Sequence, residues 1–268
     1  MGRRDVVRLV PGRVEAMWWR SPLAFLLERR RRFRNHPACH VDEIADPILA
    51  ALARDGIVVL PRFHSQADVD ALHDTLREVA ERVKTGDAPG DWDVVAYPSD
   101  GIYRVRDIEA IVPQCRALLA GSATAQIVRS YLQGEPRRTT YVDYKPDVGV
   151  HDNTTVPHMD NCWSQVKVFT LLHDVGPDQA PLVYWKRSHR PGRWRLLPDF
   201  LNFIGHRFGG GGVCPPDVLV AEEEGGSIEM VTVTGEAGTV AVMDARGFHR
   251  ASNLNAGYRL QLVEAYQL

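Results

Sequence analysis

The sequence contains no long hydrophobic run. Of its 268 residues, 44% are hydrophobic and 25% are charged, which are ordinary values for a globular protein. No apolar stretch approaches the roughly 18–20 residues that are needed to cross a bilayer. The short apolar stretch at residues 22–27 is followed by arginines, which is not the pattern of a secretory signal peptide. We therefore expect a cytoplasmic protein with no membrane partner.

Paired cysteines and an excess of charge are missing as well. The four cysteines lie far apart and form no CxxC motif: Cys39, Cys115, Cys162 and Cys214. Scattered thiols of this kind favour a reducing compartment over a disulfide framework. The net charge is −2, so no overall basic field favours nucleic acid. We interpret the basic run from Arg29 to Arg34 as a solvated helix face and expect no nucleic-acid partner.

The texture of the sequence changes near residue 137. Residues 1–44 are predicted to form an irregular or helical N-terminal arm. Helical patterns dominate residues 45–136, and short β-rich runs separated by Gly, Pro and Asp turns dominate residues 137–268. Such runs favour a sandwich, a jelly roll or a barrel. Because the helices need a sheet on which to bury their apolar faces, we expect residues 45–268 to form one domain with a helical half packed on a β core.

Several individual elements are clearly marked. Asp46 followed by proline is a typical helix start, and Gly56 is a typical helix end. Ser65 precedes a second helix from about residue 66 to residue 84, in which apolar residues recur at spacings of three and four. A strand is predicted between these helices, at residues 57–60. The β-rich runs predicted as strands are Thr139–Tyr144, Gln165–Leu172, Leu182–Trp185, Ser227–Thr234, Thr239–Met243 and Tyr258–Tyr266.

A set of metal-ligating side chains stands out in the β-rich half. His158 and Asp160 are two residues apart in a segment expected to be extended, so both side chains point to the same side. A third ligand is available at His249. Two imidazoles and one carboxylate leave coordination positions open, which is the facial triad of non-haem Fe(II) oxygenases. Ten residues further on, Arg259 lies in the last predicted strand, where its guanidinium can bind a carboxylate with two parallel hydrogen bonds.

The ordered set of motifs resembles the phytanoyl-CoA dioxygenase (PhyH-like) family. The matching stretches are PHMDNCWSQVKVFTLLHDVGPDQAPLVYWKRSH at 157–189, GTVAVMDARGFHRASNLNAGYRLQLVEAY at 238–266 and GIVVLPRF at 56–63. Two corners depart from the family pattern. Arg187 stands where the glycine of a Gly-Ser-His corner is usual, and Gln179-Ala180-Pro181 replaces the usual Asn-Gly-Pro turn, which puts the geometry of these corners in doubt.

The resemblance implies a double-stranded β-helix (jelly-roll, cupin-like) core with Fe(II), 2-oxoglutarate and O2 as cofactor and cosubstrates. It makes His158, Asp160 and His249 the iron ligands and Arg259 the anchor of 2-oxoglutarate. It also suggests Lys167 as a further cosubstrate contact. No protein general base is implied, and no catalytic residue is implied beyond the metal ligands. We interpret His189, in the Arg187-Ser188-His189 corner, as a structural residue rather than a ligand.

Four aromatic or polar side chains near the motif are candidates to line the substrate side: Asn161, Trp163, Tyr141 and Tyr144. For the aromatic members, core packing is an equally good interpretation. The expected function is the oxidation of a small molecule whose identity the sequence does not give. By analogy with the family, we expect a role in natural-product biosynthesis. Hydroxylation is the default outcome, and desaturation, epimerisation and oxidative cyclisation remain open. Two alternatives also remain open: a redox-neutral metal-dependent isomerase or hydrolase, and a non-catalytic binding module.

Overall fold

A computed structural model describes most of the chain beyond residue 43. The described residues are 41, 44–119, 123–150, 155–160, 165–190, 192, 194–196, 198–199, 212–213 and 216–268. Most of the predicted N-terminal arm lies outside these residues, and so does the basic run from Arg29 to Arg34. Among the described residues, no helix is both long and apolar enough to span a membrane.

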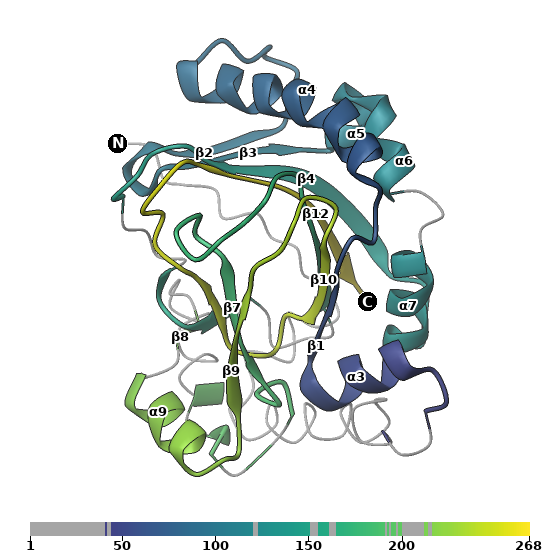
Figure 1. Cartoon of the computed structure of the whole chain (residues 1–268), viewed down its shortest axis with the longest axis vertical. Helices are drawn as coiled ribbons and strands as arrows, with labels where there is room; N and C mark the ends of the chain where they lie inside the picture. The colour runs from purple at the N-terminus through teal and green to yellow at the C-terminus, as the bar shows by residue number, and fades with distance from the viewer. Residues whose placement is uncertain are drawn as a thin grey trace, which may run out of the picture.

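Two antiparallel β-sheets form the centre of the molecule (Figure 1). The larger sheet has the strand order β1-β10-β6-β12-β4-β3-β2, and the smaller one has the order β8-β5-β11-β7-β9. The strands of the larger sheet are β1 (Ile57–Leu60), β2 (Val94–Tyr97), β3 (Ile102–Arg106), β4 (Arg137–Lys145), β6 (Gln165–Leu171), β10 (Val240–Asp244) and β12 (Arg259–Gln267). The strands of the smaller sheet are β5 (His158–Met159), β7 (Leu182–Lys186), β8 (Gly212–Val213), β9 (Glu229–Val233) and β11 (His249–Ala251). Chain segments distant in sequence alternate between the sheets, as in a double-stranded β-helix.

Helices cover the outer face of the larger sheet and one end of the smaller sheet (Figure 1). The helices are α3 (Pro47–Asp55), α4 (Gln66–Thr85), α5 (Ile108–Ile111), α6 (Arg116–Leu119), α7 (Ala123–Leu132) and α9 (Pro216–Glu224), with short 3₁₀ turns η3 (Pro98–Asp100) and η4 (Pro113–Cys115). The predicted strands of the β-rich half are confirmed within a few residues at their ends.

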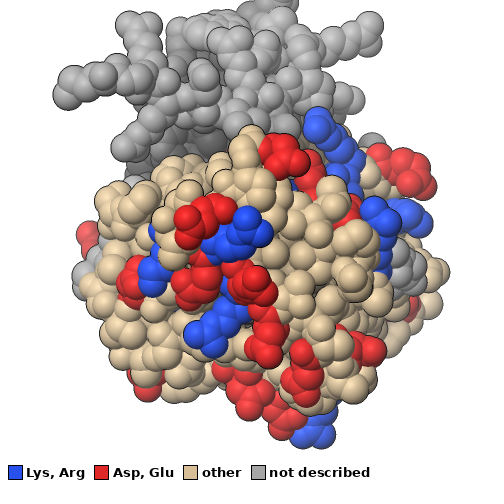
Figure 2. All heavy atoms as spheres, turned by 90° about the horizontal axis from the view of Figure 1, so that it is seen from above, with Lys and Arg blue, Asp and Glu red and all other residues tan. Residues whose placement is uncertain are grey.

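The two marked helices of the N-terminal part are confirmed with their caps. The Asp46 carboxylate accepts hydrogen bonds from the backbone N–H groups at the start of α3, and Gly56 ends that helix in the left-handed conformation. Ser65 caps α4 in the same way as Asp46 caps α3. The apolar stripe of α4 is buried against the larger sheet, in a cluster that includes Val105, Val142 and Leu262. Figure 2 shows acidic and basic side chains mixed over the face of the molecule on which α4 lies.

Alternation along the strands gives the larger sheet two different faces. On the outer face, Val166, Val168 and Val242 pack with α3 and α7. On the inner face, a smaller apolar cluster between the sheets includes Ala241 and Met243 together with residues of β7. The rest of the inner face carries polar and charged side chains, which are described below. The fold therefore keeps its main apolar contacts outside the sheet and its polar chemistry between the sheets.

The N-terminal part supplies strands as well as helices. β1 was predicted, but β2 and β3 were not, although both extend the larger sheet beyond β4. β2 is an exposed edge strand, and β3 carries arginines at the positions that face the interior. β2 shows no clear alternation of apolar and polar residues. β3 alternates over only a few residues, in which Tyr103 and Val105 pack under α4 and the two arginines face inward, and no β-rich run was recognised there.

The two corners that depart from the family pattern keep a glycine-like backbone. Ala180 has φ 52° and Arg187 has φ 69°, so both residues occupy the left-handed region that favours glycine. The Arg187 guanidinium donates to the backbone carbonyls of Gly226 and Ser227, which helps to hold this conformation. The substitutions therefore leave the turn geometry intact at a cost of about 1 kcal/mol each.

Two glycines with similar backbone angles, Gly56 and Gly86, allow a test of how tightly the corner between α3 and β1 is packed. Gly56 has φ 79°, and a Cβ there would overlap with the Tyr184 hydroxyl and the His189 ring. Gly86, at the end of α4, has φ 82° but open space around it. We expect Gly86→Ala to lower the free energy of unfolding by about 1 kcal/mol from backbone strain alone, and Gly56→Ala by about 2–4 kcal/mol because overpacking is added. Urea unfolding of both variants measures the difference, and equal losses would contradict the close packing at Gly56.

Candidate metal centre

Three side chains converge between the sheets at the end of the smaller one. His158 lies on β5 and is paired directly across the ladder with His249 on β11, and Asp160 follows β5 by one residue. One potential ligand atom of each residue lies within 4.8 Å of the others. Nε2 of His249 is 3.2 Å from a carboxylate oxygen of Asp160, and Nε2 of His158 is 4.0 Å from the other oxygen. The spacing expected from the sequence thus brings the three predicted ligands together.

Backbone carbonyls hold both imidazole rings in the orientation that a metal requires. Nδ1 of His158 is 2.8 Å from the carbonyl oxygen of Val156, and Nδ1 of His249 is 3.0 Å from that of Gly247. Each carbonyl is placed to accept a hydrogen bond from Nδ1–H, and each Nε2 lies on the side of Asp160. Such hydrogen bonds are the usual means by which a protein fixes a metal-binding histidine.

The electrostatics of the cluster favour the deprotonated, metal-binding forms of His158 and Asp160. Burial and the neighbouring His249 lower the pKa of His158 to about 4. Burial acts to raise the pKa of Asp160, but the Lys167 ammonium and His249 outweigh it and hold the pKa well below its usual range. At neutral pH the cluster therefore presents neutral His158 and ionised Asp160, which are the donor forms that ferrous iron prefers.

Lys167 contacts the cluster itself. Its ammonium, on the inner face of β6, lies 2.7 Å from a carboxylate oxygen of Asp160. Burial lowers the pKa of Lys167, but the attraction of Asp160 outweighs this effect and raises it. The structure thus places Lys167 beside the candidate ligands, and its contact with the cosubstrate stays a prediction.

Arg259 lies deeper between the sheets, at the start of β12. Its Nη1 donates to the carbonyl of Ala180 at 3.1 Å and its Nη2 to the carboxylate of Asp143 at 2.7 Å. Its Nε is buried and has no hydrogen-bond partner among the described residues. A buried N–H without a partner carries a desolvation cost, so this donor points to a bound acceptor. The guanidinium fits a carboxylate ligand at this position.

A second arginine shares the same carboxylate. Nε of Arg104, on β3, donates to the other oxygen of Asp143 at 2.5 Å, and the two residues are directly paired across β3 and β4. Burial acts to raise the pKa of Asp143, but Arg104 and Arg259 outweigh it and lower the pKa to about 2. Two guanidinium charges thus surround one carboxylate, which leaves a net positive charge for an anionic ligand.

Sequence reasoning missed Arg104 and Asp143. Asp143 was placed inside a predicted strand but had no assigned role, and Arg104 lies in a strand that was not predicted. Their approach depends on the register of β3 against β4, which no local pattern of residues specifies. A signal was present only in the alternation of charged residues along both strands, at positions 104, 143 and 145.

The two tyrosines proposed to line the substrate side lie on opposite faces of β4. Tyr141 faces the interior, where the guanidinium of Arg104 lies 5.5 Å from its ring centre. Tyr144 belongs to the apolar cluster under α4, and its hydroxyl donates to Glu81 of that helix. Their spacing of three residues explains the difference, because side chains alternate along a strand. Tyr144 therefore does not face the ligand cluster. Asn161 and Trp163 lie outside the described residues.

His189 is a structural residue, as its sequence position indicated. It is fully buried at the corner after β7, and its Nε2 lies 3.1 Å from the carbonyl oxygen of Ala53 at the end of α3. Burial lowers the pKa of His189 to about 4. The imidazole is therefore neutral at physiological pH and links the corner to the helical layer.

Fold and cluster together define the class of the protein. A double-stranded β-helix with two histidines and one carboxylate at its mouth, and with buried arginines behind them, is the architecture of a non-haem iron oxygenase. The residues also fit the two groups that such an enzyme holds, because the donor set suits ferrous iron and the unpartnered Arg259 Nε suits a carboxylate.

The comparisons with known proteins identify the family. The family described as phytanoyl-CoA dioxygenase (PhyH) matches residues 52–260, which is more than three quarters of the chain. The chain belongs to this family and is an Fe(II)- and 2-oxoglutarate-dependent dioxygenase. This result decides against the two alternatives left open above, the redox-neutral metalloenzyme and the non-catalytic module. No curated protein matches the sequence.

Solved structures with the same fold are distant in sequence. The epimerase SnoN from nogalamycin biosynthesis is 19% identical with a TM-score of 0.58, over 85% of this chain and 83% of that one. The carbocyclase SnoK from the same biosynthesis is 18% identical with a TM-score of 0.55, over 85% of each chain. EctD from S. alaskensis, with 2-oxoglutarate and 5-hydroxyectoine, is 21% identical with a TM-score of 0.61, over 87% of this chain and 77% of that one. At these identities the likeness shows the fold.

The buried histidine at the corner gives a pH prediction for the metal-free protein. Since the pKa of His189 is about 4 in the fold and 6.5 ordinarily, the unfolded chain binds more protons between these values. The stability that His189 confers is therefore complete above pH 6.5 and is lost as the pH falls towards 4. The lowered pKa of His158 acts in the same direction.

We expect the free energy of unfolding to fall by roughly 2 kcal/mol between pH 7 and pH 5 for each such imidazole. Urea unfolding in the presence of a chelator measures this loss. In His189→Gln, which keeps a donor for the Ala53 carbonyl but does not titrate, the loss should shrink by about that amount. An unchanged pH dependence in the variant would show that His189 is not the titrating group.

Proposed function

We propose that this dioxygenase binds its iron through His158, Asp160 and His249 and oxidises a small organic molecule at that centre. The observation that carries the proposal is the convergence of these three side chains, with each histidine oriented by a backbone carbonyl. When bound, the ferrous iron and 2-oxoglutarate supply the activation of dioxygen. The chain itself supplies fixed ligands, an anchor for the cosubstrate and a place for the substrate.

Arg259 is proposed as the anchor for the distal carboxylate of 2-oxoglutarate. Its buried Nε is available, and its two terminal nitrogens are held by Ala180 and Asp143, so the guanidinium cannot rotate away. Arg104 adds a second positive charge beside Arg259 through their shared contact with Asp143. A dianionic cosubstrate is therefore attracted to cations that are already oriented, which lowers the entropic cost of binding.

The reaction outcome is proposed from the ligand set and from the enzymes that share the fold. Asp160 leaves the iron with a complete set of protein ligands, which favours hydroxylation as the default. SnoN is described as an epimerase and SnoK as a carbocyclase on the same fold, so epimerisation and cyclisation use closely similar scaffolds. Both belong to nogalamycin biosynthesis, and this supports a role for the present enzyme in tailoring a natural product. Succinate formation that depends on a candidate small molecule is the assay for its substrate.

The metal assignment predicts the behaviour of the ferrous complex. Anaerobic addition of Fe(II) and 2-oxoglutarate to the metal-free protein should produce the visible charge-transfer band of a chelated ferrous site. His158→Ala should abolish the band and all turnover, because an imidazole ligand is lost. His64→Ala is the matched control, since His64 lies outside the cluster, and it should leave the band unchanged. A band of normal intensity in His158→Ala would exclude His158 as a ligand.

The anchor assignment predicts a separation between metal and cosubstrate binding. Arg259→Gln should raise the dissociation constant of 2-oxoglutarate about 10- to 100-fold, the value of a hydrogen-bonded charge pair, and leave Fe(II) affinity unchanged. Titration of the Fe(II) protein with 2-oxoglutarate measures the change. Arg104→Gln should have a smaller effect, because that guanidinium is more exposed. Arg62→Gln, at an exposed ion pair, is the control. If Arg259→Gln bound 2-oxoglutarate as tightly as the control, Arg259 would not be the anchor.

A further inference from the structure

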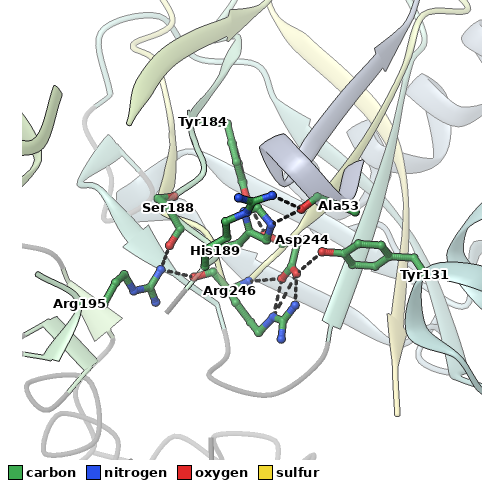
Figure 3. Close-up of polar contacts among 9 residues, drawn as sticks. Ala53, Tyr131, Tyr184, Ser188, His189, Arg195, Asp244 and Arg246 are labelled. Atoms are coloured by element: carbon green, nitrogen blue, oxygen red, sulfur yellow. Dashed lines mark hydrogen bonds and ion pairs between the residues drawn. The ribbon is translucent and has the colours of Figure 1, made fainter. Parts of the chain in front are cut away.

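A buried polar network surrounds the chain segment that leads to His249 (Figure 3). Its centre is the 244–249 turn, which joins β10 to β11 and ends at His249. The turn begins with Asp244 and Arg246, which are 1% and 5% exposed. Neither residue is a candidate ligand, and the function proposed above gives neither a role.

Asp244 and Arg246 form a close ion pair within the turn. Nε of Arg246 donates to both carboxylate oxygens of Asp244, at 2.9 and 3.0 Å, and Nη2 donates to one of them. The backbone N–H of Arg246 donates to the same carboxylate at 2.9 Å. The Tyr131 hydroxyl, from α7, donates to it at 2.8 Å (Figure 3). The Asp244 carboxylate thus links two residues within the turn and also links the turn to α7.

Other buried groups hold the remaining part of the turn. The Ser188 hydroxyl accepts a hydrogen bond of 2.8 Å from the backbone N–H of Phe248. The guanidinium of Arg195 donates to the backbone carbonyls of Ser188 and Arg246, the latter at 3.0 Å, and lies 4.6 Å from the centre of the Phe248 ring. Gly247 passes so close to Tyr184 that a Cβ would overlap with its hydroxyl. Little freedom remains for the backbone.

The same turn contacts two of the three candidate ligands. The carbonyl of Ala245 accepts a hydrogen bond from the backbone N–H of Asp160 at 3.2 Å. The carbonyl of Gly247 lies 3.0 Å from Nδ1 of His249 and sets the rotation of its ring. A displacement of the turn would therefore move Asp160 and His249 together. His158 has its own carbonyl partner at Val156 and lies on another strand.

The energetics of the ion pair also indicate a positioning role. Removing two charged groups from water costs several kcal/mol, and a well-packed apolar pair of similar volume is often as stable or more stable. What an apolar pair lacks is direction, because only the planar fork of arginine on a carboxylate fixes the relative orientation of both groups. The chain places this directional contact three residues before a candidate ligand.

We propose that Asp244 and Arg246 are positioning residues for the metal centre, which hold the 244–249 turn so that Asp160 and His249 meet one ion. The inference rests on the ligand assignment proposed above. It predicts that loss of the fork weakens metal binding beyond any effect on folding. Outer residues that orient metal ligands contribute about 10- to 100-fold to metal affinity in other proteins.

The test uses Co(II) as a probe, titrated into the metal-free full-length protein well below the unfolding temperature of every variant. Arg246→Lys keeps the positive charge but loses the fork. We expect its Co(II) dissociation constant to rise about 10- to 100-fold, with altered visible bands of the bound ion. Thermal unfolding of the metal-free variant is measured in parallel. Wild-type affinity and bands in Arg246→Lys, at any unfolding temperature, would overturn the proposal.

A matched control separates positioning from general destabilisation. Glu264 is also buried and paired with an arginine, Arg138, but it lies on β12 away from the turn. Glu264→Gln should lower the unfolding temperature and leave Co(II) affinity within about twofold. If it weakens Co(II) binding as much as Arg246→Lys does, the effect is not specific to the turn and the proposal fails.

Two further variants keep the test decisive. Should Arg246→Lys fail to fold, Tyr131→Phe removes one hydroxyl that donates to Asp244 and should raise the dissociation constant severalfold; an unchanged value would overturn the proposal. His158→Ala tests the ligand assignment itself. If His158→Ala binds Co(II) as the wild type does, the proposed metal site fails, and the positioning role fails with it. If only His158→Ala loses Co(II), the metal site stands and the positioning role fails alone.

Discussion

The alternation of side chains along the strands of the larger sheet is the constraint on which the rest of the structure depends. One set of alternate residues is apolar and packs under α3, α4 and α7, so the stability of the fold comes mainly from the outer face. The other set points between the sheets and is thereby freed to carry charge: Arg104 on β3, Asp143 on β4, Lys167 on β6 and Arg259 on β12. The space between the sheets can hold charged side chains because the principal apolar core lies on the outer face.

Charges between the sheets must then be satisfied by one another or by ligands. Asp143 lies between two guanidinium groups, and Asp160 lies among Lys167 and two imidazoles. In both places, burial acts to raise the carboxyl pKa and the neighbouring cations outweigh it. Each cluster therefore keeps its carboxylate ionised at neutral pH. The ion that suits the Asp160 cluster is a metal cation, and the ion that suits the arginines is a carboxylate.

How much of this could be predicted from the sequence depends on the range of the interaction. Local patterns marked the caps of α3 and α4, and the two-residue spacing of His158 and Asp160 predicted a shared direction that the structure reproduces. Ordered motifs shared with a known family linked these residues to His249 and Arg259. Arg104 could not be linked to Asp143 in this way, since their contact depends on the register of β3 against β4, which no local pattern of residues specifies. Tyr144 was misplaced for a simpler reason, because its position relative to Tyr141 already put it on the other face of β4.

The buried network around the 244–249 turn connects the helices on the outer face to the candidate metal centre between the sheets. Tyr131 reaches from α7 to Asp244, the carbonyl of Gly56 accepts a hydrogen bond from the backbone N–H of Asp244, and His189 ties the corner beside the turn to the end of α3. Through these contacts the helical layer is joined to the segment that ends at His249. The helices therefore do more than cover the sheet, because a displacement of α3 or α7 would be transmitted to the turn. On this proposal, the helical layer and the buried network together set the positions of Asp160 and His249.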